Sequence, residues 1–337
     1  MTERYRIFII CAFAIAFFTA VAQLRRTYMP SSNLQTTVWK VRVNEEKSQE
    51  DEKPPGKRRK KAAMCTIVKN EEAYIDEWVD YHLALGFDPI YIYDNSDEFE
   101  MRQWGNETKG DHVRVIHFPG QAVQMKAYLD CAKKLTRKKR KKTTWAAFFD
   151  VDEFLVLKKH DHVSDFLEDH CPHGEIGINW FMFGASSRNL YAPLPVTKRF
   201  TYREPKVNQH IKSIVRLADM NMQKLGGVHH VLLNKGNQHD TNGRKFVGPF
   251  NPDGPTDVSV IHHYHTKSHK EYIYKRLRGR ADTSWKKGNM KTALKDAKKG
   301  LEKALAGVEV NMNYTFDDTG WTLMKKYVPI YAMFDEI

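Results

Sequence analysis

The sequence predicts an α/β fold in which helices flank a mixed sheet, and three observations support this prediction. Short apolar runs alternate with a helical pattern before residue 155. Polar side chains follow several of these runs, as they do where strand ends form a ligand site. The second half of the chain carries further short apolar runs between loops rich in Gly, Pro, Asn and Asp. With 337 residues and a net charge of +13, the chain allows one large domain or two small ones.

The chain is expected to begin its globular part in the order strand, helix, strand. The first strand is expected at residues 62–68, and Asn70 is the expected N-cap of the helix that follows. Apolar residues then recur every four positions, at Ile75, Val79 and Leu83. Gly86 ends this helical pattern, and a second strand follows at 89–93. This order predicts parallel strands joined by a crossover helix.

Further elements are expected along the rest of the chain. A strand at 113–118 and a helix at 121–135 precede an apolar run from Trp145 to Phe154 that is expected to form a strand. In the second half, strands are expected at 175–183, 198–202, 212–217, 228–233 and 258–264, and helices at 267–278 and 290–305.

The apolar run from Trp145 to Phe154 contains two aspartates, Asp150 and Asp152. Side chains alternate along an extended chain, so both carboxylates are expected to point the same way. Such hard oxygen ligands suit Mn²⁺ or Mg²⁺, and Mg²⁺ is usually held by one or two carboxylates together with substrate phosphates. The motif therefore predicts a site for a metal-bound diphosphate at a strand end.

The N-terminal residues predict a membrane anchor. Residues 1–6 carry two arginines and residues 7–22 carry no charge, so we expect a cytosolic tail over 1–6 and a signal anchor over 7–24. A cleaved signal peptide is the alternative, because Ala20-Val21-Ala22 has the form of a cleavage site. Either alternative places the remaining chain in the secretory lumen. Residues 25–61 are polar and contain prolines, which is typical of a disordered stalk.

Sequons and cysteines agree with a lumenal location. Asn106-Glu107-Thr108 and Asn313-Tyr314-Thr315 are acceptor sequons for N-glycosylation. The cysteines outside the apolar segment are Cys65, Cys131 and Cys171. One disulfide can form among them, but the sequence does not determine its pairing, and three buried thiols are the open alternative.

The basic run from Lys133 to Lys142 raises the question of nucleic-acid binding. No aromatic residue interleaves it, so the stacking platform for single strands is absent. It also separates two strongly patterned elements, where an inserted loop is tolerated. We therefore expect a solvated loop and no nucleic-acid partner.

Several spaced motifs resemble glycosyltransferases of family 92 and the related family 2-like group. The motifs are Cys65 to Glu71, Glu77-Trp78, Tyr81-His82, Gly86, Tyr91 to Ser96, Gln124, Asp130-Cys131, Trp145 to Phe154, Trp180, Phe183 to Ser186, Lys212 to Val215, His263-Tyr264 and Lys267-Ser268. Together they span roughly residues 63–280, and the basic insert at 133–142 and the last 50-odd residues lie outside the resemblance.

The resemblance implies a GT-A fold, in which a single nucleotide-binding α/β unit is fused to an acceptor-binding half. It also implies a nucleotide-sugar donor, in particular a UDP-sugar, a glycan or glycoprotein acceptor, and Mn²⁺ (or Mg²⁺). Such enzymes are commonly single-pass type II proteins of the Golgi membrane with a lumenal catalytic domain, and secretion after signal cleavage is the alternative. The catalytic domain is then expected over 62–310 and a C-terminal extension over 311–337.

The resemblance also assigns roles to donor-site residues. Asp152 would be the direct metal ligand, and Asp150 would contact the metal or the ribose. Glu71 and Asp94 lie at neighbouring strand ends and would hold the uracil and ribose. Lys69 would face a phosphate.

A late histidine is the expected third metal ligand, with His262, His263 and His265 as candidates. Alternation along the expected strand places His263 and His265 on one face and His262 on the other. His263 is preferred because its His-Tyr pair matches the family, and His229 is second.

The catalytic base is expected to be a carboxylate, because an inverting transfer must deprotonate the acceptor hydroxyl. The resemblance favours inversion. The candidates, which the sequence does not separate, are Glu204, Asp240, Asp253 and Asp257.

Two other classes of protein remain as alternatives. Phosphatases of the haloacid-dehalogenase type also place Asp-x-Asp after an apolar strand and use the first Asp as nucleophile. Their motif usually continues with Thr or Val where this chain has Phe154, and it usually lies near the start of the domain. A non-catalytic basic binding protein is the other alternative, and the predicted membrane segment argues against its binding nucleic acid. A degenerate transferase that serves as a lumenal binding module is also compatible with both aspartates.

Overall fold

The computed structural model describes residues 59–107, 110–137, 143–278, 281 and 314–336. Within this part of the chain, no helix has both the length and the apolar character needed to cross a membrane. The predicted cytosolic tail, the signal anchor, nearly all of the stalk and the helix expected at 290–305 lie outside the described residues.

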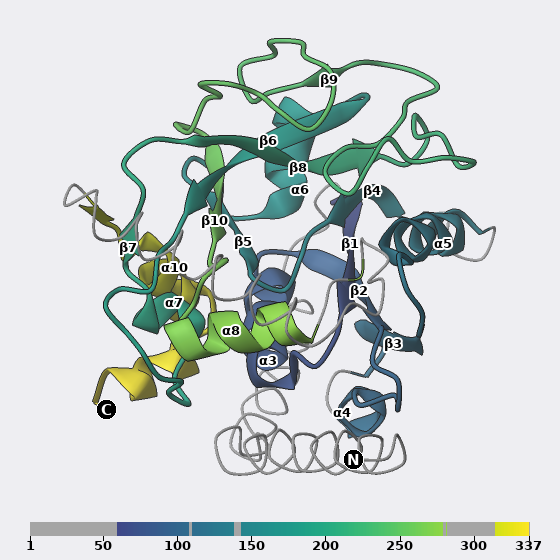
Figure 1. Cartoon of the computed structure of the whole chain (residues 1–337). Coiled ribbons are helices and arrows are strands. Elements are labelled where there is room, and N and C mark those ends of the chain that lie inside the picture. Colours follow the sequence, from purple (N-terminus) through teal and green to yellow (C-terminus); the bar gives the residue numbers. More distant parts are fainter. Residues whose placement is uncertain (1–58, 108–109, 138–142, 279–280, 282–313, 337) are drawn as a thin grey trace, which may run out of the picture.

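A mixed sheet forms the centre of the molecule and confirms the predicted α/β class (Figure 1). Its strands are β1 (Lys61–Val68), β2 (Phe87–Asp94), β3 (Val113–His117), β4 (Thr143–Phe148), β5 (Glu153–Leu157), β6 (Glu175–Met182), β8 (Asn208–Arg216), β9 (Gln238–His239) and β10 (Ser259–His263). The strand order is β3-β2-β1-β4-β8-β6-β10-β5, and β9 pairs with β6.

The strand directions decide which chain ends meet at one edge of the sheet. Strands β1 to β4 are parallel where they pair, and β6 is parallel to β10. Strand β8 runs antiparallel to both β4 and β6. The carboxyl ends of β1, β4, β6 and β10 therefore share one edge with the start of β8, which is where ligands bind in open α/β sheets.

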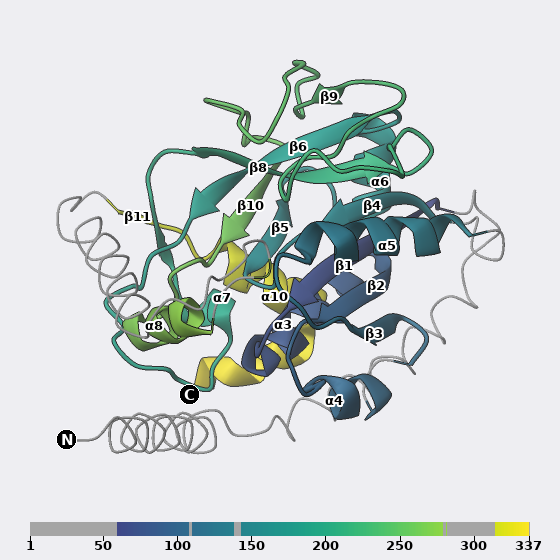
Figure 2. The same ribbon diagram turned by 45° about the vertical axis from the view of Figure 1, so that its right-hand side comes forward.

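Helices cover both faces of the sheet. They are α3 (Glu72–Ala84), α4 (Arg102–Glu107), α5 (Gln124–Thr136), α6 (Val163–His170), α7 (Val196–Arg199), α8 (His269–Leu277) and α10 (Thr319–Tyr327). Alternate side chains of β1 enter different cores, because Met64 packs in the core with α3 whereas Cys65 packs in the core with α5. Figure 2 shows α5 lying along the strands on its side of the sheet.

The connection from β1 to α3 differs from its prediction at one residue. The N-cap is Glu71, and Asn70 instead adopts a left-handed backbone conformation with φ of 50°. Asparagine tolerates this conformation, which turns the chain between strand and helix. At the other end of α3, Gly86 has φ of 104°, and a Cβ there would lie 2.2 Å from Nε2 of His162. Glycine is therefore required at this position.

The strand expected from Trp145 to Phe154 is divided into two, which corrects the prediction. Strand β4 ends at Phe148, a turn carries Asp150 and Asp152, and β5 then begins at Glu153. The turn is closed by the backbone N–H of Glu153, which donates to the carbonyl of Asp150 at 3.0 Å. The alternation expected for an extended chain does not apply to the two aspartates.

Two other strand predictions in the second half are wrong. Residues expected in a strand at 198–202 instead contribute Lys198 and Arg199 to α7, and β7 (Tyr202–Arg203) is a short strand paired with β11 (Thr315–Phe316). The buried carboxylate of Glu77 explains the helix, because it accepts the first N–H groups of α7 at 2.6 and 2.9 Å. Residues 228–233 form a loop that lies beside β8 and is held partly by side chains, for example by the Ser213 hydroxyl on the carbonyl of His229 at 2.7 Å.

The C-terminal segment packs into the same core as the sheet. Helix α10 and the 3-10 helix η2 (Pro329–Glu336) bury Trp321, Met324 and Tyr331. The Tyr331 hydroxyl donates to a carboxylate oxygen of Asp80 on α3 at 3.0 Å.

A disulfide joins Cys65 on β1 to Cys131 on α5, and Cys171 is free and buried. The pairing that the sequence left open is thereby assigned.

We predict that the double variant Cys65→Ala/Cys131→Ala loses about 4 kcal/mol of unfolding free energy, because the bond closes a loop across 66 positions. Urea denaturation measures the loss. Dithiothreitol should lower the stability of the wild type to that of the variant and leave the variant unchanged; an equal shift in both would refute the prediction.

The ion pair between Arg199 and Glu271 is almost completely buried, with both side chains 1% exposed and 2.8 Å between the charged atoms. We predict that Glu271→Gln lowers the unfolding free energy by about 3–5 kcal/mol, because it leaves the guanidinium charge unpaired in the core. Urea denaturation is the measurement. The exposed pair of Arg59 and Asp165 is the matched control, and Asp165→Asn should cost about 0–1 kcal/mol. Equal losses in the two variants would contradict the prediction.

Candidate active site

A cavity of about 340 Å³ lies at the shared edge of the sheet. It is lined by Ile67, Val68, Lys69, Glu71, Gln124, Asp150, Asp152, Trp180, Met182, Asn208, His210, Val228, His229, His263, His265, Lys275, Arg276, Arg278 and Ala281. Strand β1, the turn after β4, the ends of β6 and β10, the start of β8 and helix α8 all contribute to this wall. The strand directions therefore bring together residues that are up to about 200 positions apart.

The Asp150 carboxylate is held by three donors. One oxygen accepts from Gln124 Nε2 at 3.0 Å and from the Tyr128 hydroxyl at 3.1 Å, and the other accepts from Lys212 Nζ at 2.9 Å. Burial raises the pKa of Asp150, but the ammonium of Lys212 outweighs this effect and holds the pKa below its usual value. Asp150 is therefore ionised at neutral pH.

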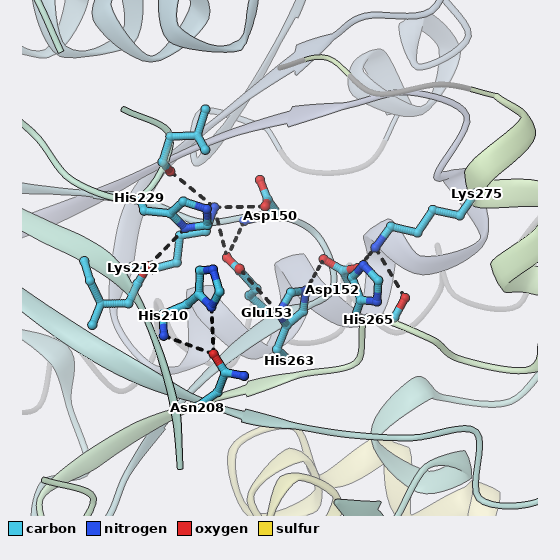
Figure 3. Close-up of polar contacts among 12 residues, drawn as sticks. Asp150, Asp152, Glu153, Asn208, His210, Lys212, His229, His263, His265 and Lys275 are labelled. Carbon is cyan, nitrogen blue, oxygen red and sulfur yellow. Dashed lines mark hydrogen bonds and ion pairs between the residues drawn. The ribbon is translucent and has the colours of Figure 1, made fainter. Parts of the chain in front are cut away.

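The Asp152 carboxylate faces a different set of cations from the same turn (Figure 3). Lys275 bonds one oxygen, Lys267 Nζ lies 3.6 Å from that same oxygen, and His263 Nε2 lies 3.6 Å from the other. Burial raises the pKa of Asp152, but Lys275 and Lys267 reverse this effect and hold it well below its usual value. Both aspartates thus present a negative charge to the cavity.

Glu153, the first residue of β5, is buried and supports the backbone of Asp150. One of its oxygens accepts the backbone N–H of Asp150 at 2.8 Å and lies 3.5 Å from Lys212 Nζ. Its other oxygen lies 4.0 Å from Nδ1 of His263, and neither of these two atoms has a hydrogen-bond partner among the described residues. The two groups therefore face each other without a hydrogen bond between them.

The structure places most of the expected donor-site residues in the cavity wall. Lys69 and Glu71 line it, and Glu71 forms an ion pair with Arg278 at 2.7 Å. Asp94 does not line it, because its carboxylate accepts the backbone N–H groups of Ser96 and Met101 in the turn after β2.

The histidines divide as the strand pattern predicts. His263 and His265 line the cavity, with ring centroids 5.3 Å apart, whereas His262 lies on the other face of β10 near Asp317. His229, the second choice for a metal ligand, also lines the cavity. Burial is the main cause that lowers the pKa of His229 to about 4, so this imidazole is neutral at pH 7.

None of the four carboxylates considered as the base lines the cavity among the described residues. Glu204 and Asp253 are exposed, and Asp257 forms a surface ion pair with Lys159 at 2.8 Å. Asp240 is buried in a turn, where it accepts the backbone N–H of Asn242 at 3.0 Å and pairs with Arg244.

The residues present fit a divalent cation that shares its coordination with a substrate. In the described part of the chain, no three His, Cys, Asp or Glu side chains converge to hold an ion by themselves. Asp152 and His263 offer one oxygen and one nitrogen 3.6 Å apart at the cavity wall. Mg²⁺ is commonly bound through one or two carboxylates with the remaining positions filled by phosphates and water, so this small donor set is sufficient.

Several residues in or next to the cavity carry no assigned role in the sequence prediction. Lys212 is the most informative, because a lysine between Ile211 and Ile214 in an apolar strand signals a buried charge partner. Trp180 and His210 meet only in three dimensions, across neighbouring strands, and no sequence spacing indicates their contact. Lys275 reaches Asp152 from a helix 123 positions later in the chain.

The family model described as "Glycosyltransferase family 92" matches residues 60–300. The chain belongs to glycosyltransferase family 92. The family resemblance seen in the spaced motifs is thereby confirmed.

Among curated proteins that carry this family name, one from Oryza sativa subsp. japonica is 28% identical over 178 residues, which cover 51% of this chain and 30% of that protein. One from Arabidopsis thaliana is 27% identical over 193 residues, which cover 52% and 32%.

The match to these family 92 relatives spans about a third of their length. Among solved structures, a 4-diphosphocytidyl-2C-methyl-D-erythritol synthase superposes with a TM-score of 0.29 and 12% identity, covering 48% of this chain and 77% of that one.

Lys212 is fully buried between Asp150 and Glu153, so its removal leaves the ionised Asp150 carboxylate without its cation. We predict that Lys212→Met lowers the unfolding free energy at pH 7 by about 3–5 kcal/mol. In the wild type Lys212 depresses the pKa of Asp150, so the stabilisation by this pair is retained down to pH values below the usual aspartate pKa. In the variant only burial acts on Asp150 and raises its pKa, so protonation near pH 4 relieves the unpaired charge. The penalty should therefore be smaller near pH 4 than at pH 7.

Urea denaturation at the two pH values tests this prediction. The control is Lys159→Met, which breaks an exposed pair with Asp257 and should cost about 0–1 kcal/mol. A Lys212→Met penalty of the same size at both pH values would assign the loss to packing instead of charge.

Proposed function

We propose that this chain is a metal-dependent glycosyltransferase that moves a sugar from a UDP-sugar to a hydroxyl of a glycan or glycoprotein. One observation carries this proposal. The Asp152 carboxylate lies at the cavity, 3.6 Å from Nε2 of His263, and basic side chains of α8 line the same cavity. The proposed fold is GT-A, with β1 to β4 as the nucleotide-binding unit and the strands from β6 onward as the acceptor-binding half.

The charges around the cavity suit a nucleoside diphosphate. Lys69, Lys275, Arg276 and Arg278 line it and supply cations toward a leaving diphosphate. Asp152 and His263 would hold Mn²⁺ or Mg²⁺, which, when bound, acts as a Lewis acid that stabilises the developing negative charge. The Lys275 ammonium donates to one oxygen of Asp152. When substrate binds, we expect it to exchange this partner for a phosphate oxygen.

The same geometry disfavours the phosphatase alternative. A haloacid-dehalogenase-type enzyme needs its first aspartate as a free nucleophile. Both oxygens of Asp150 are instead occupied, by Lys212 on one side and by Gln124 and Tyr128 on the other. A structural and charge-balancing role is therefore the better account of Asp150.

We further propose that the catalytic domain works in the Golgi lumen as part of a single-pass type II membrane protein. The uncharged residues 7–22 and the sequons support this proposal. The disulfide between Cys65 and Cys131 adds support, because such bonds persist in oxidising compartments.

We predict that the full chain binds UDP in the presence of Mn²⁺ and that Asp152→Asn weakens this binding at least tenfold, equivalent to about 1.4 kcal/mol. Isothermal titration calorimetry with and without Mn²⁺ measures the effect. Asp161→Asn is the matched control, because the side chain of Asp161 is 79% exposed in a surface ion pair. UDP binding that is indifferent to both Mn²⁺ and Asp152 would overturn the proposed donor site.

A further inference from the structure

Every carboxylate that lines the cavity is engaged by a cation among the described residues. Glu71 pairs with Arg278 and Asp150 pairs with Lys212. Asp152 pairs with Lys275 and faces the metal-binding position. Among the described residues, the proton acceptor for an incoming hydroxyl is therefore sought in another kind of side chain.

Four imidazoles line the same cavity. The neighbours of three of them make these three less suited to accept a proton from the hydroxyl. His263 faces Asp152. His265 packs edge-on against the His263 ring at 5.3 Å between centroids, and Lys275 donates to its carbonyl at 3.4 Å. His229 is bonded through Nδ1 to the carbonyl of Ile211 at 3.2 Å, and its pKa of about 4 makes it a weak base.

In His210 the partner of Nδ1 is a neighbouring side chain, that of Asn208, instead of a backbone carbonyl. The Asn208 side-chain oxygen accepts the backbone N–H of His210 at 3.0 Å, which identifies it as the oxygen end of the amide. The same oxygen lies 2.8 Å from Nδ1 of His210, so Nδ1 carries the ring proton. The Nε2 lone pair is left available, and Nε2 has no hydrogen-bond partner in the described part of the chain.

Two aromatic rings hold the His210 imidazole beside the donor site. Trp180 stacks on it with 10° between the planes and 5.1 Å between centroids, and Phe250 contacts it edge-on at 4.8 Å. Trp180 also contacts His263 at 4.4 Å. His210 and Lys212 lie on the same face of β8, and Lys212 reaches Asp150, so His210 borders the same cavity as the aspartates (Figure 3).

We propose that His210 is the general base of the transfer and that Asn208 is its positioning residue. This inference rests on the proposed glycosyltransferase function and replaces the carboxylate base expected from the sequence. The acceptor hydroxyl gives its proton to Nε2 of His210 while its oxygen bonds to the anomeric carbon of the donor sugar. The bond from that carbon to the diphosphate breaks, and the diphosphate leaves with the electron pair.

The surroundings of His210 keep its imidazole neutral and able to accept a proton. Burial lowers the pKa of His210 below its usual value. The titratable or charged groups that face it are His229, whose ring centroid lies 5.5 Å away, and Lys212 on the same strand face. Asn208, Trp180 and Phe250 contribute no charge.

Chemical rescue tests the proposal. The full chain, His210→Gly, His210→Gln and Asn208→Ala are compared for transfer from a panel of UDP-hexoses to a pool of glycans released from glycoproteins, and UDP binding with Mn²⁺ is measured for each. We expect His210→Gly and His210→Gln to lower kcat by about 10²–10⁴-fold with UDP affinity unchanged. Added imidazole should restore transfer in His210→Gly but not in His210→Gln. Asn208→Ala should show a smaller loss and a shifted pH profile.

The outcomes separate this inference from the proposed function. If the wild type binds no UDP, the proposed function itself fails. If the wild type transfers sugar and either His210 variant retains a rate within about threefold, His210 is not the base. A loss that imidazole does not restore in His210→Gly, or one accompanied by weaker UDP binding, assigns His210 a structural role and also overturns the inference.

Discussion

The geometry of the site depends on the ion pair that the fully buried ammonium group of Lys212 forms with Asp150. It reaches from β8 to the turn between β4 and β5, where it pairs with Asp150 at 2.9 Å and lies 3.5 Å from Glu153. Because Glu153 also bonds the backbone of Asp150, one cation and one buried carboxylate hold the turn from two sides. The direction of Asp152 follows from this arrangement, since it lies within the same turn.

The resulting cavity has two chemically different sides. Toward α8, carboxylates and basic side chains alternate and neutralise one another, which suits a charged diphosphate with its metal. Toward β6 and β8, the wall consists of Trp180, Asn208 and imidazoles whose pKa values are lowered by burial. This side offers an indole ring and several neutral hydrogen-bonding groups, which suit a sugar and its hydroxyls. The two sides meet at His263, which contacts both Asp152 and Trp180.

The first half of the fold could be predicted from the sequence because it depends on local patterns. The strands near 62–68, 89–93 and 113–118 are regular apolar runs, and their parallel order places polar residues at one edge. The turn at Asp150 was not predictable in this way, because a buried lysine 62 positions later holds it. Likewise, α7 forms where a strand was expected because the distant Glu77 binds its first N–H groups. Chemical type alone points to carboxylates as the base, and only the folded cavity distinguishes them from His210.

The packing of the C-terminal segment has a consequence for how this domain matures. Tyr331 on η2 bonds Asp80 on α3, and the two residues lie 251 positions apart in the chain. Synthesis proceeds from the N-terminus, so α3 and its neighbouring strands emerge long before the residues that complete their core. Until residue 331 has been synthesised, the apolar surface that α10 and η2 cover in the folded domain is exposed to solvent. The core around α3 is therefore covered only after residue 331 has been synthesised, and before that point its apolar side chains are open to aggregation.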